Sequence, residues 1–469
     1  MAKEVLKPGR FTPKTLRLVG SGGSVDLQNF AGQLTIFENV LSNCLFGELA
    51  IGDARNLIQE LKLRGTEKVI VEMQSVLTDG SPQCGSLKFE FIVSGIVDRV
   101  LKQDRESMYV LKLISPEGYE NSSRVATKRF KGDPKGVLNQ VYNEFVDAGS
   151  GGLDFFGLEF KRTEYVFNAN YWTGYRCMNY SLKQLAPKGS PEYMPNTLLF
   201  QSDKKNYCTS LSKMSHIYTS QRLLYDCFNL VSNLSEEAPK GGVREGGYSY
   251  IHPFIDAKYN SMDGVSTPIF TDIMHDLNTG YMGSTTIGFD MHKRLPMSMM
   301  FDYTPNQAGI AGLPPVAGNP ALLPYKYDSF YHTKHTAAIN PINERIKFHP
   351  YSNVNVKIGN HNIWNDTEYG YDRFHFENTA FRDSAVAELT RHQIDIKVNG
   401  RTDVDLGMLV FLRFPNPKPK GENPSYEDIY DMKQSGVYQI IGIRHDFLFG
   451  DAFEHEMKLE VIRDSTEKK

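Results

Sequence analysis

Three histidines have the spacing in this chain that comes nearest to a metal site. His332 and His335 stand three residues apart in YHTKH, and His349 follows as a third candidate ligand. On a helix this spacing would place the first two imidazoles on one side, where they could bind zinc. The HExxH pattern, which brings its own carboxylate, is missing. Because near pairs arise by chance among 12 histidines, we favour surface or packing roles over a metal site.

The segment DVDLG, residues 403–407, has the alternating carboxylates with which a calcium-binding loop begins. Such a loop needs a bidentate Glu further on, and Phe414 stands at that position. The glycine also comes one residue early. We therefore interpret Asp403, Asp405 and Gly407 as parts of a turn between two strands.

No motif for covalent or nucleotide chemistry is present. The chain has no GxSxG elbow, no GxxxxGK[ST] loop and no strand followed by GxGxxG and a helix. Asp53, Asp98 and Asp104 lie in or beside expected β-turns, where solvated carboxylates are commoner than paired acids and bases. Cys44 has the apolar neighbours Leu45 and Phe46, which favours a buried thiol over a nucleophile. We therefore predict that the protein is not an enzyme and needs no metal or cofactor.

Length and composition exclude several classes of protein. The 469 residues suggest about three compact units. A hydrophobic fraction of 40% and an aromatic fraction of 12% exclude a mainly disordered chain. The net charge of −3 supplies no overall field to hold nucleic acid or an anionic membrane. Five cysteines without CxxC spacing favour a reducing compartment, and no apolar run predicts a secretory signal or a membrane span.

Alternation of apolar and polar residues predicts antiparallel strands between Phe11 and Ser115. The longest example is LKFEFIVSGIV, in which one face is apolar and the other polar. Turns at Gly and Asp residues suit a barrel or sandwich better than a parallel α/β sheet. The residues expected in the core of this first barrel include Leu34, Ile36, Val69 and Val71.

A mixed α/β unit is expected after Pro116. Apolar residues at helical spacing predict one helix over 134–146 and a second one within 171–186. The segments NTLLFQ and NYCTSL then predict a hairpin with its turn at 202–205.

Residues 236–377 are rich in Gly, Pro, Met, Tyr and His, and they predict an inserted irregular or mixed region. It is expected to hold a helix near Pro268–Leu277 and a strand near Thr285–Phe289. LPMSMMFDY, residues 295–303, suits either a core strand or an adaptable partner surface, and we favour the strand. The Pro/Gly-rich stretch 305–324 predicts an extended loop that binds a partner. Its candidate contact residues are Leu313, Val316, Leu322 and Leu323.

Clean alternation returns after an expected helix over 378–390. Strands are predicted around 394–398, 407–414, 437–443 and 456–461, so a second barrel-like unit closes the chain. In its last strand we expect Glu456, Lys458 and Glu460 to face solvent, a channel or another subunit. The residues expected in its core are Ile394, Ile396, Met457, Leu459 and Val461.

Several segments, in this order along the chain, resemble the hub protein of contractile phage tail baseplates. LTIFENVLSNCLFGELAIGDARNLIQELKLRGTEKVIVEM is similar to the opening strands of that family's first barrel. RVATKRFKGDPKGVLNQVYNEF, TLLFQSDKKNYCTSLSKM and GYMGSTTIGFDMHKRLPMSMMFDY are similar to its middle part. The most specific segments are VNGRTDVDLGMLVFLRFPNP, SGVYQIIGIRHDF and HEMKLEVIRDS, which look like the second barrel. Residues 305–373 are placed only by exclusion.

The resemblance implies an α+β, mostly antiparallel fold with two tail-tube-like β-barrels and an inserted mixed α/β domain. The implied units are 1–115 for the first barrel, 116–235 for the mixed domain with its hairpin, 236–377 for the inserted region and 378–469 for the second barrel. It also implies a structural homotrimer in the virion, assembled in the host cytoplasm, that joins the threefold spike to the sixfold tail tube around the genome-ejection channel. Implied partners are the spike, the tail tube or its initiator, the tape-measure protein and baseplate wedge proteins. DNA would only pass through, and no stable membrane binding is expected.

Two alternatives remain open at this point. One is a hub from a related contractile injection machine. The other is a β-rich glycan-binding or hydrolytic tail protein, which would need exposed tryptophans and paired carboxylates flanking a cleft. The chain has two tryptophans, Trp172 and Trp364, which weakens that alternative.

Overall fold

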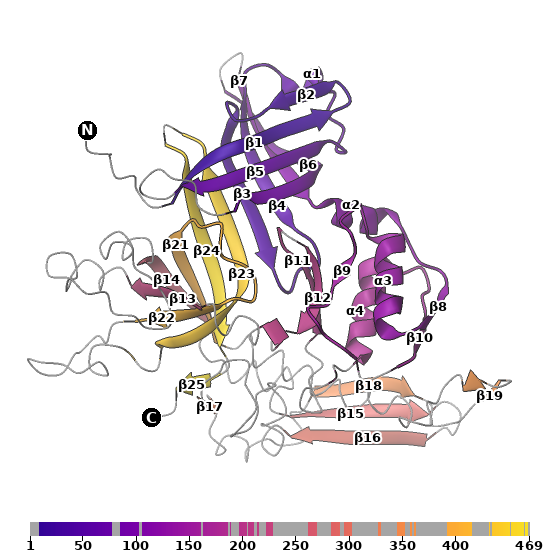
Figure 1. The fold of residues 1–469 in the computed structure, drawn as a ribbon. Coiled ribbons are helices and arrows are strands. Elements are labelled where there is room, and N and C mark those ends of the chain that lie inside the picture. Colours follow the sequence, from indigo (N-terminus) through magenta and orange to yellow (C-terminus); the bar gives the residue numbers. More distant parts are fainter. Residues whose placement is uncertain are drawn as a thin grey trace, which may run out of the picture.

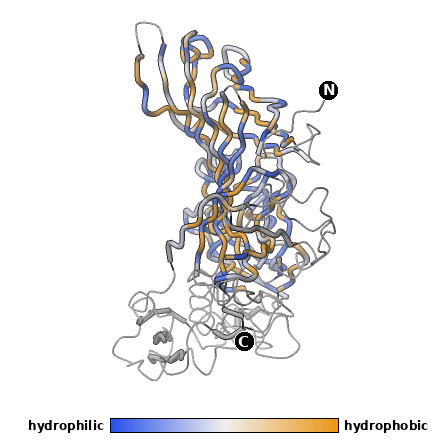
Figure 2. The backbone as a smooth tube through the Cα atoms, turned by 90° about the vertical axis from the view of Figure 1, so that its left-hand side faces the viewer, coloured by the Kyte–Doolittle hydropathy of each residue, from blue (hydrophilic) through white to orange (hydrophobic). Residues whose placement is uncertain are grey.

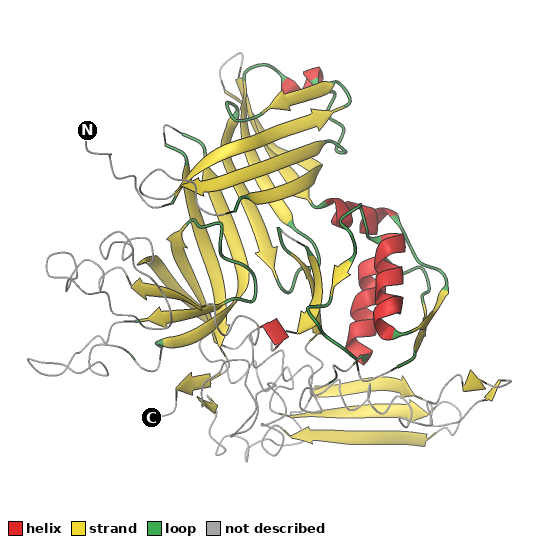
Figure 3. Cartoon of the chain, in the orientation of Figure 1, coloured by secondary structure: helices red, strands yellow, loops and turns green. Residues whose placement is uncertain are grey.

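The architecture is that of a computed structural model of the chain. The ranges that it describes are 9–76, 85–102, 106–160, 163–185, 188, 197–203, 205–210, 213–214, 222–227, 261–269, 283–290, 295–302, 327–329, 345–351, 357–358, 361–362, 392–414, 431, 434–450, 452–463 and 465–467. Most of the described elements are antiparallel strands, with few helices (Figure 3). The chain is therefore α+β and mostly antiparallel, as the sequence predicts.

The first part of the chain forms a curved antiparallel sheet with a short helix, α1 (Leu57–Glu60) (Figure 1). The apolar residues that alternate with polar ones in the sequence are the buried residues of these strands, because they face one common core. The tube in Figure 2 shows the same alternation of apolar and polar residues along the strands. The strands are β1 (Arg10–Gly20), β2 (Gly23–Asp26), β3 (Ala31–Asn39), β4 (Phe46–Asp53), β5 (Lys68–Val76), β6 (Leu87–Lys102) and β7 (Glu106–Ile114).

This first sheet closes on itself through strands from the other end of the chain. Its own order is β3-β4-β7-β6-β5-β1, and β23 (Gly436–Leu448) pairs with the free edge of β3. The next strand, β24 (Glu454–Arg463), then reaches β1 through the single pair Arg10↔Glu454. The circuit of strands therefore contains the hairpin β23–β24, which the sequence analysis assigned to the second barrel alone.

A second circuit closes on the other side of the same hairpin. Its order is β24-β21-β14-β13-β22-β23, and β23 pairs with β24 to complete it. The further strands are β13 (Arg222–Cys227), β14 (Ser261–Ile269), β21 (His392–Asn399) and β22 (Leu409–Arg413). β13 runs parallel to both of its neighbours, β14 and β22. This circuit thus takes in β13 and β14, from segments that the sequence analysis placed in the mixed domain and the inserted region.

The mixed α/β unit packs beside the first sheet and has a core of its own (Figure 1). Helices α3 (Pro134–Phe145) and α4 (Gly174–Gln184) lie where the sequence predicts helices, and β11 (Thr197–Gln201) and β12 (Asn206–Ser210) form the expected hairpin. The helix α2 (Pro116–Ser123) was not expected. The remaining strands of the unit are β8 (Arg129–Gly132), β9 (Leu153–Asp154) and β10 (Tyr165–Asn168).

Within the inserted region the structure describes separate strands. β15 (Gly283–Asp290) and β16 (Leu295–Asp302) form a pair, in agreement with the strands expected there, and β15 also pairs with β18 (Arg345–Tyr351), which was not expected. Pro268 and Ile269 end strand β14, so the helix expected from Pro268 does not begin there, and its other residues lie outside the described ranges. The helix expected over 378–390 also lies outside them. Two small pairs complete the fold: β17 (Tyr327–Ser329) with β25 (Ser465–Glu467), and β19 (Lys357–Ile358) with β20 (His361–Asn362).

Candidate functional site

The hairpin β23–β24 is the element that both sheet circuits share. Its register runs from Gln439↔Ile462 to Leu448↔Glu454, with a bulge between Ile440 and Gly442. Ile440, near one end, packs in the second core, whereas Phe447, near the other end, packs in the first. In the same way Val40, just after β3, belongs to the second core. The junction between the two circuits is therefore a continuous piece of sheet, and we treat it as the candidate functional site.

The predicted core residues lie in these two cores. In the first core, Leu34, Ile36, Val69 and Val71 are each at most 1% exposed. The second core holds the other five, which are also at most 1% exposed: Ile394, Ile396, Met457, Leu459 and Val461.

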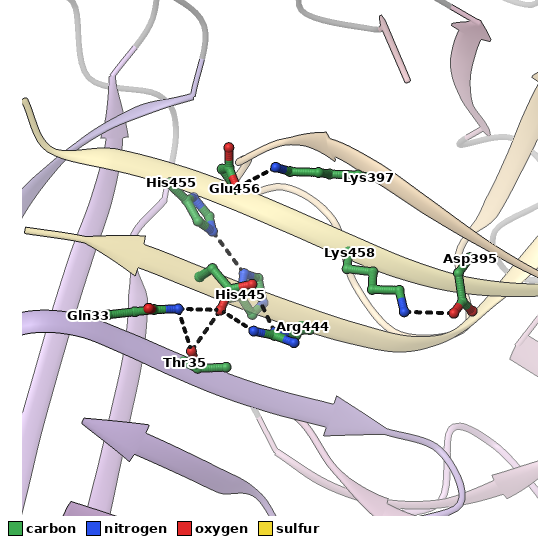
Figure 4. A network of polar contacts seen from close by, with 10 residues as sticks. Gln33, Thr35, Asp395, Lys397, Arg444, His445, His455, Glu456 and Lys458 are labelled. Carbon is green, nitrogen blue, oxygen red and sulfur yellow. Dashed lines mark hydrogen bonds and ion pairs between the residues drawn. The ribbon is translucent and has the colours of Figure 1, made fainter. Parts of the chain in front are cut away.

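The polar side of β24 carries ion pairs with the neighbouring strand β21. Lys458 Nζ lies 2.7 Å from Asp395 Oδ2, and Lys397 Nζ lies 2.8 Å from Glu456 Oε2 (Figure 4). Both lysine side chains are about half exposed, so these pairs are screened by solvent and contribute little to stability. They give this face of the hairpin charges of both signs.

Three ionisable side chains are buried together at the junction. Glu38 comes from β3, His445 from β23 and His455 from β24. Nε2 of His445 lies 3.2 Å from Oε1 of Glu38, and Nδ1 of His445 lies 3.0 Å from Nε2 of His455. The exposed fractions of the three residues are 4%, 0% and 1%, in the order Glu38, His445, His455. We call these residues the junction triad; Figure 4 shows its two histidines on neighbouring strands.

Burial determines the charge state of the inner histidine. The protein interior penalises a charged ring, and the adjacent His445 adds to this, so the pKa of His455 lies well below its ordinary value of 6.5. His455 is therefore neutral at physiological pH. Its ring also stacks on Phe447 with a centroid separation of 4.2 Å, which holds it in place.

A separate polar cluster lies on the outer side of the same strands, centred on Asp446. Thr35 Oγ1 donates to Asp446 Oδ1 over 2.7 Å, and Gln33 Nε2 donates to the same oxygen over 3.2 Å. Arg444 Nε lies 2.9 Å from Asp446 Oδ2. Because Arg444 and Asp446 come from β23 and the other two from β3, this cluster ties the hairpin to the first circuit from outside.

At the bulge in β23, Gly442 leaves room for a contact between β3 and β24. Asn39 Nδ2 donates to Glu460 Oε2 over 3.0 Å, and a Cβ at Gly442 would lie 2.6 Å from that oxygen. Burial, together with the nearby Asp395, raises the pKa of Glu460 against the opposing effects of Lys458 and Asn39. A partly buried carboxyl is therefore held between the two circuits.

Two of the three candidate histidine ligands lie outside the residues that the structure describes. His349 lies in β18, whereas His332 and His335 lie outside the described residues. Asp403 forms an ion pair with Arg401 Nη2 at 2.6 Å, and Gly407 turns with φ of 80°. No cluster of three or more His, Cys, Asp or Glu side chains able to hold a metal occurs among the described residues.

Other predictions from the sequence have mixed outcomes. Within the described ranges Cys44, Cys177 and Cys208 are free thiols. The partner-loop candidates Leu313, Val316, Leu322 and Leu323 lie outside the described residues. None of the helices in the described part of the chain has the length and apolar composition of a membrane-crossing segment.

The sequence analysis missed the junction triad. Its signal is a polar residue at an inward position of an alternating strand: His445 stands between Ile443 and Phe447, and His455 stands two residues before Met457. Such a position normally takes an apolar residue, so a histidine there needs a buried partner.

Comparison with family models and with curated proteins finds no match to this chain. Among solved structures, it is similar to a tail protein from Neisseria meningitidis, at 10% identity and a TM-score of 0.48, over 97% of each chain. It is also similar to the 43 kDa tail protein of prophage MuSo2 from Shewanella oneidensis, at 9% identity and a TM-score of 0.45, over 96% of this chain and 98% of that one. A third similar structure, from the Francisella PdpA–VgrG complex, has 10% identity and a TM-score of 0.44, over 99% of this chain and 60% of that one. Tail proteins, the class that the sequence resembles, are thus among the structures to which this chain is similar.

Proposed function

We propose that this protein is the structural hub of a contractile phage tail baseplate. In this role three copies form a ring around the genome-ejection channel, and the ring joins a threefold spike to a sixfold tail tube. The protein then acts through its surfaces and not through catalysis. Its place is the tail of the virion, after assembly in the host cytoplasm.

The observation that carries this proposal is the pair of closed circuits that share the hairpin β23–β24. A ring of three identical chains has threefold symmetry. If each chain contributes two similar barrels, the ring presents six, which is the number that a sixfold tube requires. The continuous hairpin fixes the two circuits to each other, so their relative position is set within one chain before any partner binds.

The sequence resemblance supports the same role and suggests the partners. These are a spike protein on one side, the tail tube or its initiator on the other, and the tape-measure and wedge proteins around them. The near balance of 52 basic and 55 acidic residues suits a protein that lets DNA pass without holding it. Stable binding to a membrane is not part of the proposal.

Sedimentation velocity of the purified chain, followed by electron microscopy of the particles, tests the proposal. We expect particles of three 53.1-kDa chains whose views along the axis show six similar lobes. A monomer at micromolar concentration, or a ring with another number of chains, would contradict it. Binding of the trimer to a phage spike would favour the phage hub, and binding to the spike of an injection machine would favour the hub of such a machine. Release of sugar from host glycans would favour the third alternative, a glycan-acting tail protein.

A further inference from the structure

The junction triad lies where three strands from distant parts of the chain meet. His445 pairs in register with Ile36 of β3 on one side and with Met457 of β24 on the other. The three side chains thus bridge β3, β23 and β24, the strands through which the first circuit is joined to the hairpin. We call this meeting of β3, β23 and β24 the joint, and any change in the charge of the triad affects the stability of the joint.

The hydrogen bonds of the triad leave room for one proton between the two rings. A carboxylate only accepts, so Nε2 of His445 donates to Glu38 and Nδ1 of His445 is then free to accept from Nε2 of His455. If both facing nitrogens carried hydrogens, the two N–H groups would point at each other across 3.0 Å. The closed joint therefore accommodates at most one positive charge on the pair of rings.

Among the described residues, the contacts of the two rings include one carboxylate, that of Glu38. β3 presents Glu38, β23 presents His445, and β6 presents the uncharged Phe89, whose ring centroid lies 6.4 Å from that of His445. Asp203 approaches with its backbone N–H, which donates to Glu38. Asp446 and Glu456, which neighbour the two histidines in sequence, form their ion pairs with Arg444 and Lys397.

The far edge of the inner ring is closed by backbone. The amide of His455 donates to Gly9, and its carbonyl accepts from the amide of Gly400. A Cβ at Gly400 would lie 2.2 Å from Nδ1 of His455, so this glycine lies against the ring edge. Nδ1 has no hydrogen-bond partner among the described residues, so a proton added there would be a buried donor without an acceptor.

We propose that the junction triad is an acid-sensitive latch, which keeps the hairpin β23–β24 joined to β3 at neutral pH and releases it when both histidines take up protons. The low pKa of His455 agrees with this geometry. In the opened joint both rings reach water and bind protons near pH 6.5, whereas the closed joint binds at least one proton fewer. Stability that is present above pH 6.5 is therefore lost as the pH falls below it. Well below pH 6.5, one missing proton corresponds to about a tenfold rise in the opening constant for each pH unit.

Hydrogen–deuterium exchange on the purified full chain measures this opening. We expect the opening constant of amides in β3 and β23 to rise about fivefold between pH 6.5 and pH 5.5, after correction for intrinsic exchange rates, because an exposed ring is already half protonated at pH 6.5. The hairpin β11–β12 of the mixed unit serves as an internal reference and should show no such rise. In His455→Gln, whose amide can still donate to His445 but cannot be protonated, the rise should disappear.

The matched control is His392→Gln, which makes the same change in β21. His392 pairs with Arg463, at the end of β24 that lies away from His455. This variant should keep the acid response. Equal pH dependence in the unmodified chain and in His455→Gln would refute the latch.

If His455→Gln does not fold, the NMR titration of the His455 ring decides: a ring that gains its proton near pH 6.5 in the folded chain would overturn the proposal. Neither measurement depends on trimer formation, so the latch can fail while the proposed function stands.

Discussion

Asn39 on β3 donates its side-chain amide to the carboxyl of Glu460 on β24, 421 positions further along the chain. The contact crosses the strand β23, which lies between the two, and it does so at Gly442, where a side chain would block it. The two ends of the chain are thus held together through a partly buried acid, and this has consequences for stability.

Replacing Glu460 with Gln should stabilise the chain at neutral pH. The pKa of Glu460 is raised, so folding favours its protonated form and ionisation costs stability as the pH rises. Gln keeps an oxygen that accepts from Asn39 but cannot ionise. We expect a higher urea midpoint than in the original chain at pH 7, and no difference below about pH 4, where Glu460 is protonated in both states. Glu48→Gln, an exposed change on β4, should have no effect at pH 7; a lower midpoint for Glu460→Gln at pH 7 would refute the assignment.

Leu459 and Lys458 are neighbours on β24 that should respond differently to truncation. Leu459 is 0% exposed in the second core, so Leu459→Ala should cost about 2–5 kcal/mol through lost transfer energy and the cavity left behind. Lys458 is paired with Asp395 on the half-exposed face, and Lys458→Ala should cost no more than about 1 kcal/mol. Urea denaturation at pH 7 measures both. The reverse order of the two effects would mean that the faces of β24 are assigned the wrong way round.

Gly400→Ala should strongly weaken the junction. Its Cβ would lie 2.1 Å from Cγ of His455 and 2.5 Å from the carbonyl oxygen of the same residue, and neither can retreat easily from a buried site. Overpacking of this kind costs about 1–3 kcal/mol. Thermal unfolding monitored by circular dichroism is the measurement. Gly95→Ala, where a Cβ meets nothing within 4 Å, is the control and should change the midpoint little. Equal effects of the two substitutions would contradict the packing at His455.

The described thiols should be inert in the native protein. Burial raises the pKa of Cys44 and of Cys177 to about 11, and it also raises that of Cys208. At pH 7 only about one thiol in ten thousand would then be a thiolate. In a Cys84→Ser, Cys227→Ser background, a thiol-specific chromogenic reagent should react with all three after denaturation and with none within minutes before it. Rapid reaction of one thiol in the folded chain would exclude this burial.

The Pro/Gly-rich stretch 305–324 is predicted to contact a neighbouring chain. A variant with this stretch replaced by a short Gly-Ser linker should keep the circular dichroism spectrum and melting temperature of the original chain, because the stretch is not expected to supply a core. It should nevertheless fail to complete tails in a complementation assay. Complete tails from the shortened protein would refute the prediction.

Local patterns predicted many of the strands and two of the helices, because burial on one face of a strand or helix leaves a period in the sequence. The missed helix α2 also has a local signal: Ser115 caps it by accepting from the amide of Gly118, and Pro116 takes its first position. A proline directly after a Ser cap is a start signal for a helix, and Pro116 has this role in α2.

The sharing of one hairpin by two circuits could not be predicted in the same way. Pairs such as Ile36↔His445 join residues more than 400 positions apart, and no local pattern records which strand edge meets which. The same holds for β13 and β14, which pair with β22 and β21 in the last part of the chain, more than 100 positions further on. For the junction triad the inward histidines gave a signal, but the partner Glu38 lies too far away in sequence to be recognised.

Closure of the first circuit by β23 and β24 affects the order in which the chain can fold. The ribosome synthesises β1 to β7 first. The edge of β3 then has no partner strand until β23 has been synthesised, more than 300 residues later. An exposed edge of this kind can pair with another chain until β23 covers it. Contacts over such separations also form slowly. A product that ends before β23 would therefore be unable to close its first circuit, and its first core would lack Phe447.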